Sequence, residues 1–148
     1  MSRCRRKTLF LASGIGPNGE GDNAIIAFSP GERMRYSLLV SDPELSPLDL
    51  AIAPNGNIIV SSEHPFGAAD AVTTIREYVP ADGHLARVFS ADRLVEFRKP
   101  RGLRFGADNN LYCVARDEVV AFDFTSGKCL GITVQFPRLY GQAIVFFP

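Results

Sequence analysis

The chain has 148 residues, of which 46% are hydrophobic and 22% charged, a composition typical of one globular domain with its own core. Its 16 basic and 16 acidic residues cancel, so no nucleic acid and no membrane surface is expected as a partner. No apolar run approaches the roughly 18 residues that cross a bilayer, and Leu9–Ala12 is too short for a secretory signal. We therefore predict a cytoplasmic protein in which residues 1–7 form a flexible basic segment.

The three cysteines are Cys4, Cys113 and Cys129. Their number is odd, and their spacing is not that of a metal site. Because disulfides are rare in reducing compartments, this pattern predicts free thiols.

The chain repeats itself with an offset of 53 positions between residues 47 and 100. The segments Ser46–Val60 and Lys99–Val114 align without a gap. The matching pairs are Pro47 and Pro100, Leu50 and Leu103, Ile52 and Phe105, Asn55 and Asp108, Asn57 and Asn110, and Ile58 and Leu111. A period near 50 residues built from short strands is typical of a propeller or a similar array.

Each unit is expected to contain four short strands. The first strand, Leu48–Ile52, alternates apolar and polar residues, and the turn Pro54–Asn57 follows it. The second strand is the continuous apolar run Ile58–Val60, which predicts burial on both faces. The links are rich in Gly, Pro, Asp and Ser, and no segment has helical periodicity beyond two turns. Asp92–Phe97 is expected to form at most one turn of helix.

The register of the repeat divides the chain into units. Thr8–Ala12 aligns with Asn57–Ser61, so the chain opens on a second strand, and Gly141–Pro148 aligns with Pro47–Pro54, so it closes on a first strand. This register predicts twelve strands. Partial units, or blades, are expected at residues 8–40, 47–90 and 100–133, with the first strand of a further blade at 141–148.

The repeat resembles those of the NHL-repeat and streptogramin-lyase-like β-propellers, which lie near the gluconolactonase propellers. It is carried in one unit by Pro47, Asp49, Leu50, Ile52, Asn55, Gly56, Asn57, Ile58 and Val60, and in the other by Pro100, Gly102, Leu103, Phe105, Asp108, Asn110, Leu111 and Val114. The resemblance implies four-stranded antiparallel blades around a channel, usually six of them. We therefore predict an all-β fold of about three β-propeller blades in permuted register, half of a six-bladed propeller.

Three blades are too few to close a ring of the usual four to eight. One interpretation is that two copies pair, each giving Gly141–Pro148 to the first blade of the other. The alternative is that the chain is a fragment of a longer propeller. The apolar, uncharged segment Ala143–Phe147 would be prone to pair with another edge. Self-association through the terminal strands 8–13 and 141–148 is therefore expected.

In a propeller, the links from second to third strand and from fourth to first strand lie on one face, where the resemblance implies a ligand site. Glu63 and His64 follow a buried strand on this face, and a carboxylate can raise the pKa of a neighbouring histidine for acid–base work. Adjacent residues of an extended strand point opposite ways, so a solvated loop is the alternative. With Asp117, these two residues form the predicted catalytic set.

The polar residues predicted to bind a ligand on this face are Asn18, Asp22, Asn23, Arg101, Arg116, Arg138 and Tyr140. Arg101 belongs to a basic cluster with Arg98, Lys99 and Arg104, and a guanidinium suits a carboxylate or phosphate. A solvated blade edge is the alternative for this cluster.

Glu20, Asp22 and Asn23 lie in one glycine-rich loop, and oxygen ligands close together can bind a divalent cation such as calcium. The spacing is not that of an EF-hand, and an ordinary loop is the alternative. No resident cofactor is predicted.

Two functions follow from these residues. The first is a non-enzymatic binding or scaffold module that presents a ligand- or protein-binding face. The second is a gluconolactonase-like or streptogramin-lyase-like hydrolase or lyase with its active site at the channel mouth, with or without a metal. The two differ in whether acidic residues and histidine from several blades converge.

Overall fold

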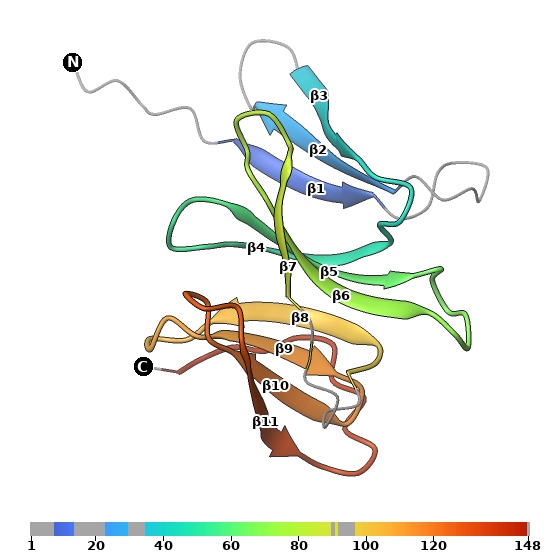
Figure 1. The fold of residues 1–148 in the computed structure, drawn as a ribbon, viewed down its shortest axis with the longest axis vertical. Coiled ribbons are helices and arrows are strands. Elements are labelled where there is room, and N and C mark those ends of the chain that lie inside the picture. The colour runs from blue at the N-terminus through green and yellow to red at the C-terminus, as the bar shows by residue number, and fades with distance from the viewer. Residues whose placement is uncertain (1–7, 14–22, 30–34, 90, 92–96, 148) are drawn as a thin grey trace.

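A computed structural model of the chain describes residues 8–13, 23–29, 35–89, 91 and 97–147. The described residues form eleven β-strands and no helix (Figure 1). The strands are β1 (Leu9–Ser13), β2 (Ala24–Ser29), β3 (Arg35–Ser41), β4 (Pro47–Ile52), β5 (Ile58–His64), β6 (Val72–Tyr78), β7 (Leu85–Phe89), β8 (Pro100–Phe105), β9 (Leu111–Ala115), β10 (Glu118–Phe122) and β11 (Cys129–Gln135). The predicted all-β class is confirmed.

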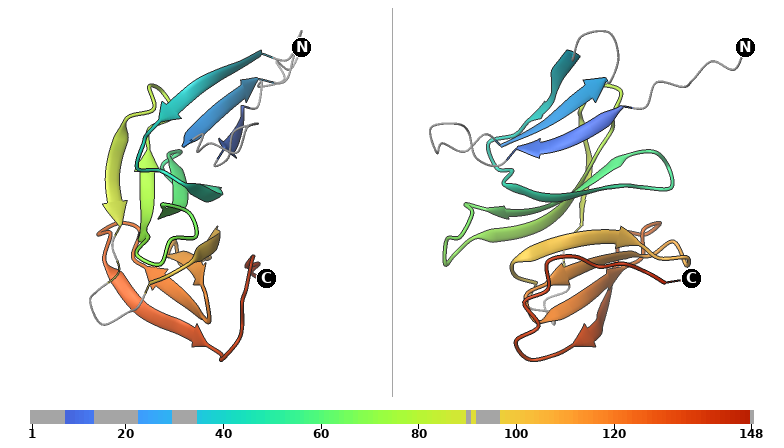
Figure 2. Two further views of the ribbon diagram at one scale, coloured as in Figure 1. Left: turned by 90° about the vertical axis from the view of Figure 1, so that its right-hand side faces the viewer. Right: turned by 180° about the vertical axis from the view of Figure 1, so that it is seen from behind.

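The strands form three antiparallel sheets, which we call the first, second and third sheet. The first has the order β1-β2-β3, the second β4-β5-β6-β7 and the third β8-β9-β10-β11. Each sheet is a meander of neighbouring strands, like a propeller blade. Figure 2 shows the sheets following one another along an arc, with β3, β7 and β11 on its convex side and β4, β8 and the C-terminal segment on its concave side.

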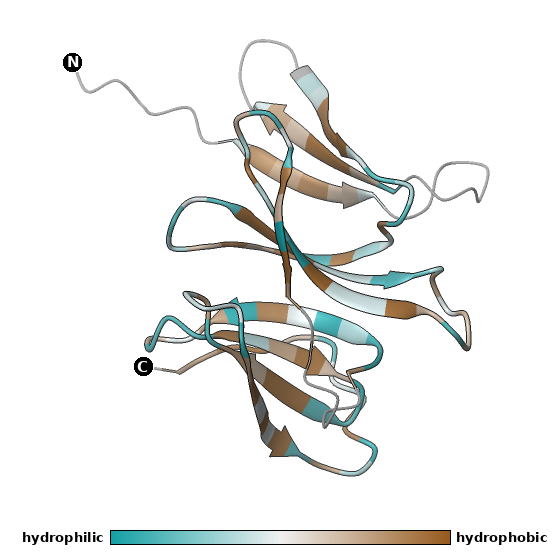
Figure 3. Ribbon diagram, viewed as in Figure 1, coloured by the Kyte–Doolittle hydropathy of each residue, from teal (hydrophilic) through white to brown (hydrophobic). Residues whose placement is uncertain are grey.

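The core lies between successive sheets rather than inside any one of them. Ile58 and Val60 of β5 belong to an apolar cluster shared with the first sheet, and Ile59 belongs to a larger cluster shared with the third. All three side chains are fully buried, which confirms the prediction that this run is covered on both faces. Apolar residues accordingly concentrate on the strands (Figure 3).

The two aligned turns close in the same way. The Ala53 N–H donates to the Asn57 carbonyl at 2.9 Å, and the Gly106 N–H donates to the Asn110 carbonyl at 3.0 Å. Asn55 holds the first turn by accepting the Asn57 N–H through its side chain. Short side chains that bond to their own backbone two residues on thus explain why Asn and Asp recur in the repeat.

A carboxylate ties the inner strand of the second sheet to that of the third. Asp49 on β4 accepts the N–H of Leu103 on β8 at 2.8 Å and lies 3.2 Å from the Arg104 guanidinium. Close by, the Ser61 hydroxyl donates to the Arg101 carbonyl at 3.0 Å. These bonds satisfy polar groups at the junction of the two sheets and so fix how β8 lies against β4 and β5.

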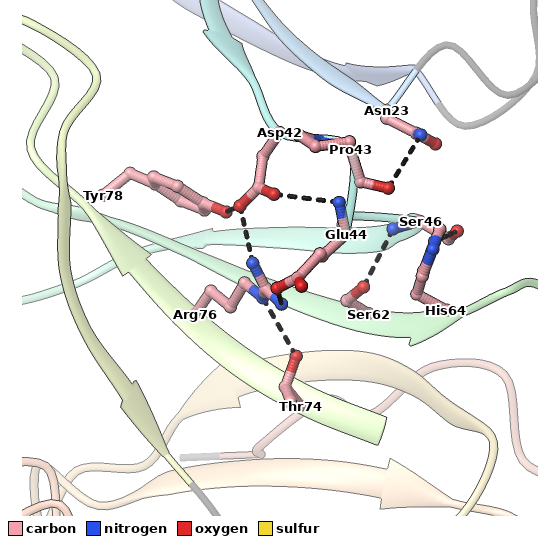
Figure 4. A network of polar contacts seen from close by, with 10 residues as sticks. All are labelled: Asn23, Asp42, Pro43, Glu44, Ser46, Ser62, His64, Thr74, Arg76 and Tyr78. Atoms are coloured by element: carbon pink, nitrogen blue, oxygen red, sulfur yellow. Dashed lines mark hydrogen bonds and ion pairs between the residues drawn. The ribbon is translucent and has the colours of Figure 1, made fainter. Parts of the chain in front are cut away.

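A second carboxylate ties the link after β3 to the second sheet. Asp42 accepts hydrogen bonds from Arg76 and Tyr78, both on β6, and from the Glu44 N–H (Figure 4). Burial alone would raise the pKa of Asp42, but these hydrogen bonds and the positive charge of Arg76 outweigh it and lower the pKa. Burial, with a further contribution from Asp42, raises the pKa of Tyr78 to about 12.

A third carboxylate, the buried Glu77 on β6, lies at the other end of the second sheet. It accepts hydrogen bonds from Asn55, Asn57 and Arg87. The Arg87 guanidinium also donates to the Phe124 carbonyl and stacks over the Phe124 ring, so it joins the second sheet to the third. Burial would raise the pKa of Glu77, but its three donors outweigh this effect and lower the pKa.

Residues 141–147 carry no strand, although a first strand was expected at 141–148. The segment lies against β8 and β9, where a Cβ built on Gly102 would come within 2.7 Å of the Ala143 Cα. A strand is defined by its pairing, and none of the described strands pairs with this segment. The expected basic segment 1–7 and the turn at Asp92–Phe97 fall on or overlap residues outside the described ranges.

Within the described residues, no helix has the length and apolar character to cross a membrane.

The lowered pKa values of Asp42 and Glu77 predict that these two carboxylates account for part of the loss of stability in acid. A carboxylate whose pKa is lower in the folded state stabilises the fold above its ordinary value, here 3.8 and 4.5, and loses that contribution as the pH falls through the folded value. We expect the free energy of unfolding to fall below about pH 4.5. D42N/E77Q should be less stable at pH 7 by about 2 kcal/mol and less dependent on pH, as measured by urea denaturation.

The control is D82N, because the Asp82 carboxylate is exposed and its hydrogen bonds among the described residues lie within its own turn. Hydrogen bonds from His84 lower the pKa of Asp82 as well, but solvent screens an exposed group and makes its contribution small. It should leave both the stability at pH 7 and its pH dependence nearly unchanged. Equal pH profiles for D42N/E77Q and the unmodified chain would contradict this account.

Candidate functional site

A pocket opens at the end of the second and third sheets that carries the links from second to third strands. Its volume is about 540 Å³. It is lined by Glu63, Gly67, Ala68, Ala69, Asp70, Ala71, Thr73, Arg98, Lys99, Arg116 and Tyr140. The pocket therefore forms at the seam between two sheets, from segments that are far apart in the sequence.

Three residues on this pocket have a backbone conformation that L-residues rarely adopt. The φ angle is +52° at Lys99, +53° at Arg116 and +43° at Tyr140. Arg116 is the first residue of a two-residue hairpin loop, a position that Gly, Asn or Asp usually takes. A non-glycine residue in this region costs about 1 kcal/mol or more, and such residues cluster at functional sites.

At the opposite end of the sheets, other residue types occupy the positive-φ positions. Its turns place Gly56, Gly83, Gly127 and Asn109 in the positive-φ region. Glycine bears no penalty there, and asparagine bears a small one. The pocket end has glycine in this region at Gly67, but it also places the long charged and aromatic side chains of Lys99, Arg116 and Tyr140 there.

Glu63 forms part of the pocket wall as an ion-paired carboxylate. Its side chain is only 5% exposed, and its Oε2 lies 3.3 Å from the Arg101 Nη1. Arg101, on β8, also lies over the Phe66 ring, with 5.8 Å between the guanidinium carbon and the ring centroid. The predicted ligand residue Arg101 thus neutralises the predicted catalytic residue Glu63.

His64 is engaged elsewhere. Its Nδ1 lies 3.0 Å from the Ser46 hydroxyl, and the Ser46 N–H donates to the Ser62 hydroxyl at 2.9 Å (Figure 4). His64 does not line the pocket that Glu63 lines. The strand alternation that separates neighbouring side chains accounts for this division.

Asp117 lines a second, smaller pocket of about 110 Å³, together with Arg98, Arg116 and Glu118. Its Oδ1 is buried and has no hydrogen-bond partner among the described residues, and its Oδ2 lies 3.8 Å from the Arg116 Nε. The three predicted catalytic side chains are therefore not gathered in one pocket.

Of the predicted ligand residues, the structure brings Arg116 and Tyr140 to the main pocket. Asn23 precedes β2 and donates to the Pro43 carbonyl at 3.3 Å, and Arg138 lies in the turn after β11 with φ of +63°. Asn18 and Asp22 lie outside the described residues, as does Glu20 of the expected calcium loop. Among the residues that the structure describes, no group of three or more His, Cys, Asp or Glu side chains could hold a metal ion.

Lys99 lines the pocket, but the sequence analysis named it only as a member of a basic cluster and not as a ligand residue. In the repeat alignment, Ser46 is equivalent to Lys99 and Glu63 is equivalent to Arg116. The structure shows the same backbone bond in both units, from the Glu63 N–H to the Ser46 carbonyl at 3.3 Å and from the Arg116 N–H to the Lys99 carbonyl at 3.4 Å. The repeat alignment was therefore the signal that could have placed Lys99 beside Arg116.

Comparison with known proteins adds no assignment to this site. No family model matches the sequence, and no curated protein matches it significantly. The resemblance to NHL-repeat and streptogramin-lyase-like propellers stays a prediction, while the sheet architecture is observed directly.

The Glu63–Arg101 pair yields a stability prediction. R101M leaves a buried carboxylate without its cation, and we expect a loss of about 3 kcal/mol in the free energy of unfolding by urea denaturation. Adding E63Q removes the unpaired charge and should restore most of the loss.

The matched control is R104M on the same strand. The Arg104 side chain is half-exposed, and its partner Asp49 keeps the Leu103 N–H, so a loss below about 1 kcal/mol is expected. Similar losses for R101M and R104M, or no recovery on adding E63Q, would contradict a buried ion pair at the pocket.

Proposed function

We propose that this chain is a non-enzymatic binding module, built from blades of the NHL-repeat and streptogramin-lyase-like kind, whose pocket takes a small anionic ligand bearing a carboxylate or phosphate group. The observation that carries the proposal is the set of left-handed residues Lys99, Arg116 and Tyr140 around one pocket. A fold that needed only tight turns there would be more stable with glycine or asparagine.

The charge of the pocket favours an anion. Arg98, Lys99 and Arg116 contribute three positive charges to the lining, and Glu63 and Asp70 contribute two negative ones, of which the Glu63 charge is paired with Arg101. An arginine guanidinium presents a planar fork that matches carboxylate and phosphate oxygens. Half of the Arg116 side chain is exposed, so its guanidinium is accessible to a ligand.

Tyr140 adds an apolar surface at the pocket rim. Its residue is largely exposed, so its ring is open to contact. A ligand with an anionic head and an organic body therefore fits these groups better than an inorganic ion.

Two free thiols support the cytoplasm as the compartment for this function. Cys113 is fully buried, and burial raises the pKa of its thiol, while Cys129 is partly buried. Unpaired cysteines are typical of proteins in a reducing environment.

A second candidate function is a hydrolase or lyase of the gluconolactonase or streptogramin-lyase type. One observation favours it, namely that the buried carboxylate of Glu63 faces the pocket. Lactone hydrolysis by the unmodified chain, lost in E63Q, would establish this activity and displace the binding module as the main proposal.

The binding proposal predicts that K99N and R116N weaken the binding of succinate and inorganic phosphate at least tenfold each, as measured by NMR titration. A charged hydrogen bond contributes about 1.5–3 kcal/mol, which corresponds to a tenfold change or more. Asparagine accepts positive φ, so both variants should be as stable as the unmodified chain or more stable by up to about 1 kcal/mol.

The control is K128N, at the exposed turn before β11 on the other end of the sheets. It should bind both anions as the unmodified chain does. Equal affinities for K99N, R116N and K128N, or no saturable binding by the unmodified chain, would refute the anion site.

A further inference from the structure

Within the described part of the chain, the first sheet has three strands where the other two sheets have four, and the inner strand is the one it lacks. β5 pairs with β4 on one side and β6 on the other, and β9 likewise pairs with β8 and β10. β1, which aligns with β5 and β9 in the repeat, pairs only with β2 among the described residues. No described strand therefore lies beside the other edge of β1 along Leu9–Ala12.

Residues 141–147, which we call the tail, present the matching element. A Cβ on Gly141 would meet the Val114 side chain, and the Phe146 ring lies 5.0 Å from the Tyr112 ring, so the tail lies against β9 as well as β8. β8 contacts β4 and β5 in the same way through Leu103 and Arg101. The tail thus stands where the first strand of a following sheet would stand.

The edge and the tail have the same chemical character. Neither Leu9–Ser13 nor Gly141–Phe147 contains a charged residue. Leu9 and Leu11 are about half-exposed, at 52% and 47%, and Val145 is 87% exposed. Natural proteins cover or charge such apolar, unpaired edges, since they otherwise template association.

We propose that a second copy of this chain completes the first sheet, with the two tails exchanged reciprocally in a closed dimer. Each copy gives one tail and receives one, so both unpaired elements are satisfied by a single twofold arrangement. The tail lies on the concave side of the arc with β4 and β8, the side on which the inner strand of the first sheet is missing (Figure 2). The tail of a second copy can fill this position, because its sequence aligns with β4 and β8, the first strands of the other two sheets.

The repeat fixes the register of the exchanged strand. Leu50 lies opposite Val60 in the second sheet, and Leu103 lies opposite Cys113 in the third. By the same alignment, Ile144 of one copy lies opposite Leu11 of the other.

Cross-linking tests this register. In a C4S/C129S background, L11C/I144C should form a covalent dimer under mild oxidation, because directly opposed strand residues lie within disulfide range. The matched control is L9C/Q142C, which lies four residues, about 14 Å, out of register. We expect the control to cross-link at least tenfold more slowly, and equal rates would overturn the proposal.

Proline substitutions test the pairing itself. N–H groups alternate along an antiparallel strand, and Leu50 and Leu103 donate theirs to Asp49 rather than across the pair. The aligned Ile144 N–H therefore faces away from the partner, and the Val145 N–H faces toward it. V145P should abolish the dimer while the chain stays folded, and I144P should weaken it much less.

Light scattering on a sizing column gives the first measurement. The unmodified chain of 16.2 kDa should elute as a discrete species of twice that mass, and V145P as a monomer with unchanged circular dichroism. A monomer or an open-ended series of oligomers for the unmodified chain, or a stable dimer for V145P, would refute the reciprocal exchange.

Discussion

The fold depends on one constraint: the central strands of its sheets are apolar on both faces. In β5, Ile58 and Val60 need a neighbour on one side and Ile59 needs one on the other, and all three are fully buried. A sheet built this way is stable only between two others, since burying each such side chain contributes about 2 kcal/mol. The stacking of sheets along an arc follows from this requirement, and so does the exposure of apolar strands at its two ends.

Buried and partly buried carboxylates then fix how the stacked sheets meet. Asp42, Asp49 and Glu77 each accept hydrogen bonds from donors on a neighbouring strand or sheet, and a carboxylate without those donors would be costly to bury. Glu63 and Arg101 follow the same pattern at the seam that bears the pocket. The geometry of the candidate site is therefore set by the packing of the second sheet against the third.

Local structure could be predicted from the sequence because the repeat encodes it. Asn55 and Asp108 mark equivalent turns, and the run Ile58–Val60 marks a doubly buried strand. The pocket could not be predicted in the same way, since Lys99 and Tyr140 reach it from segments with no local signal for their meeting. Glu63 and His64 are adjacent in sequence, yet strand alternation gives one to the pocket and the other to Ser46.

The two repeats differ most where the pocket lies. Ser46 and Glu63 in one unit share a backbone hydrogen bond, as do Lys99 and Arg116 in the other. Of these four residues, only Lys99 and Arg116 have positive φ. Arg116 lies in the two-residue loop between β9 and β10, where β5 and β6 have a longer link, and Lys99 directly precedes β8. One unit thus uses this position to close the seam with a buried ion pair, and the other uses it to present cations at the pocket. Shared positions carry the fold, and the proposed anion site lies where the two units differ from each other.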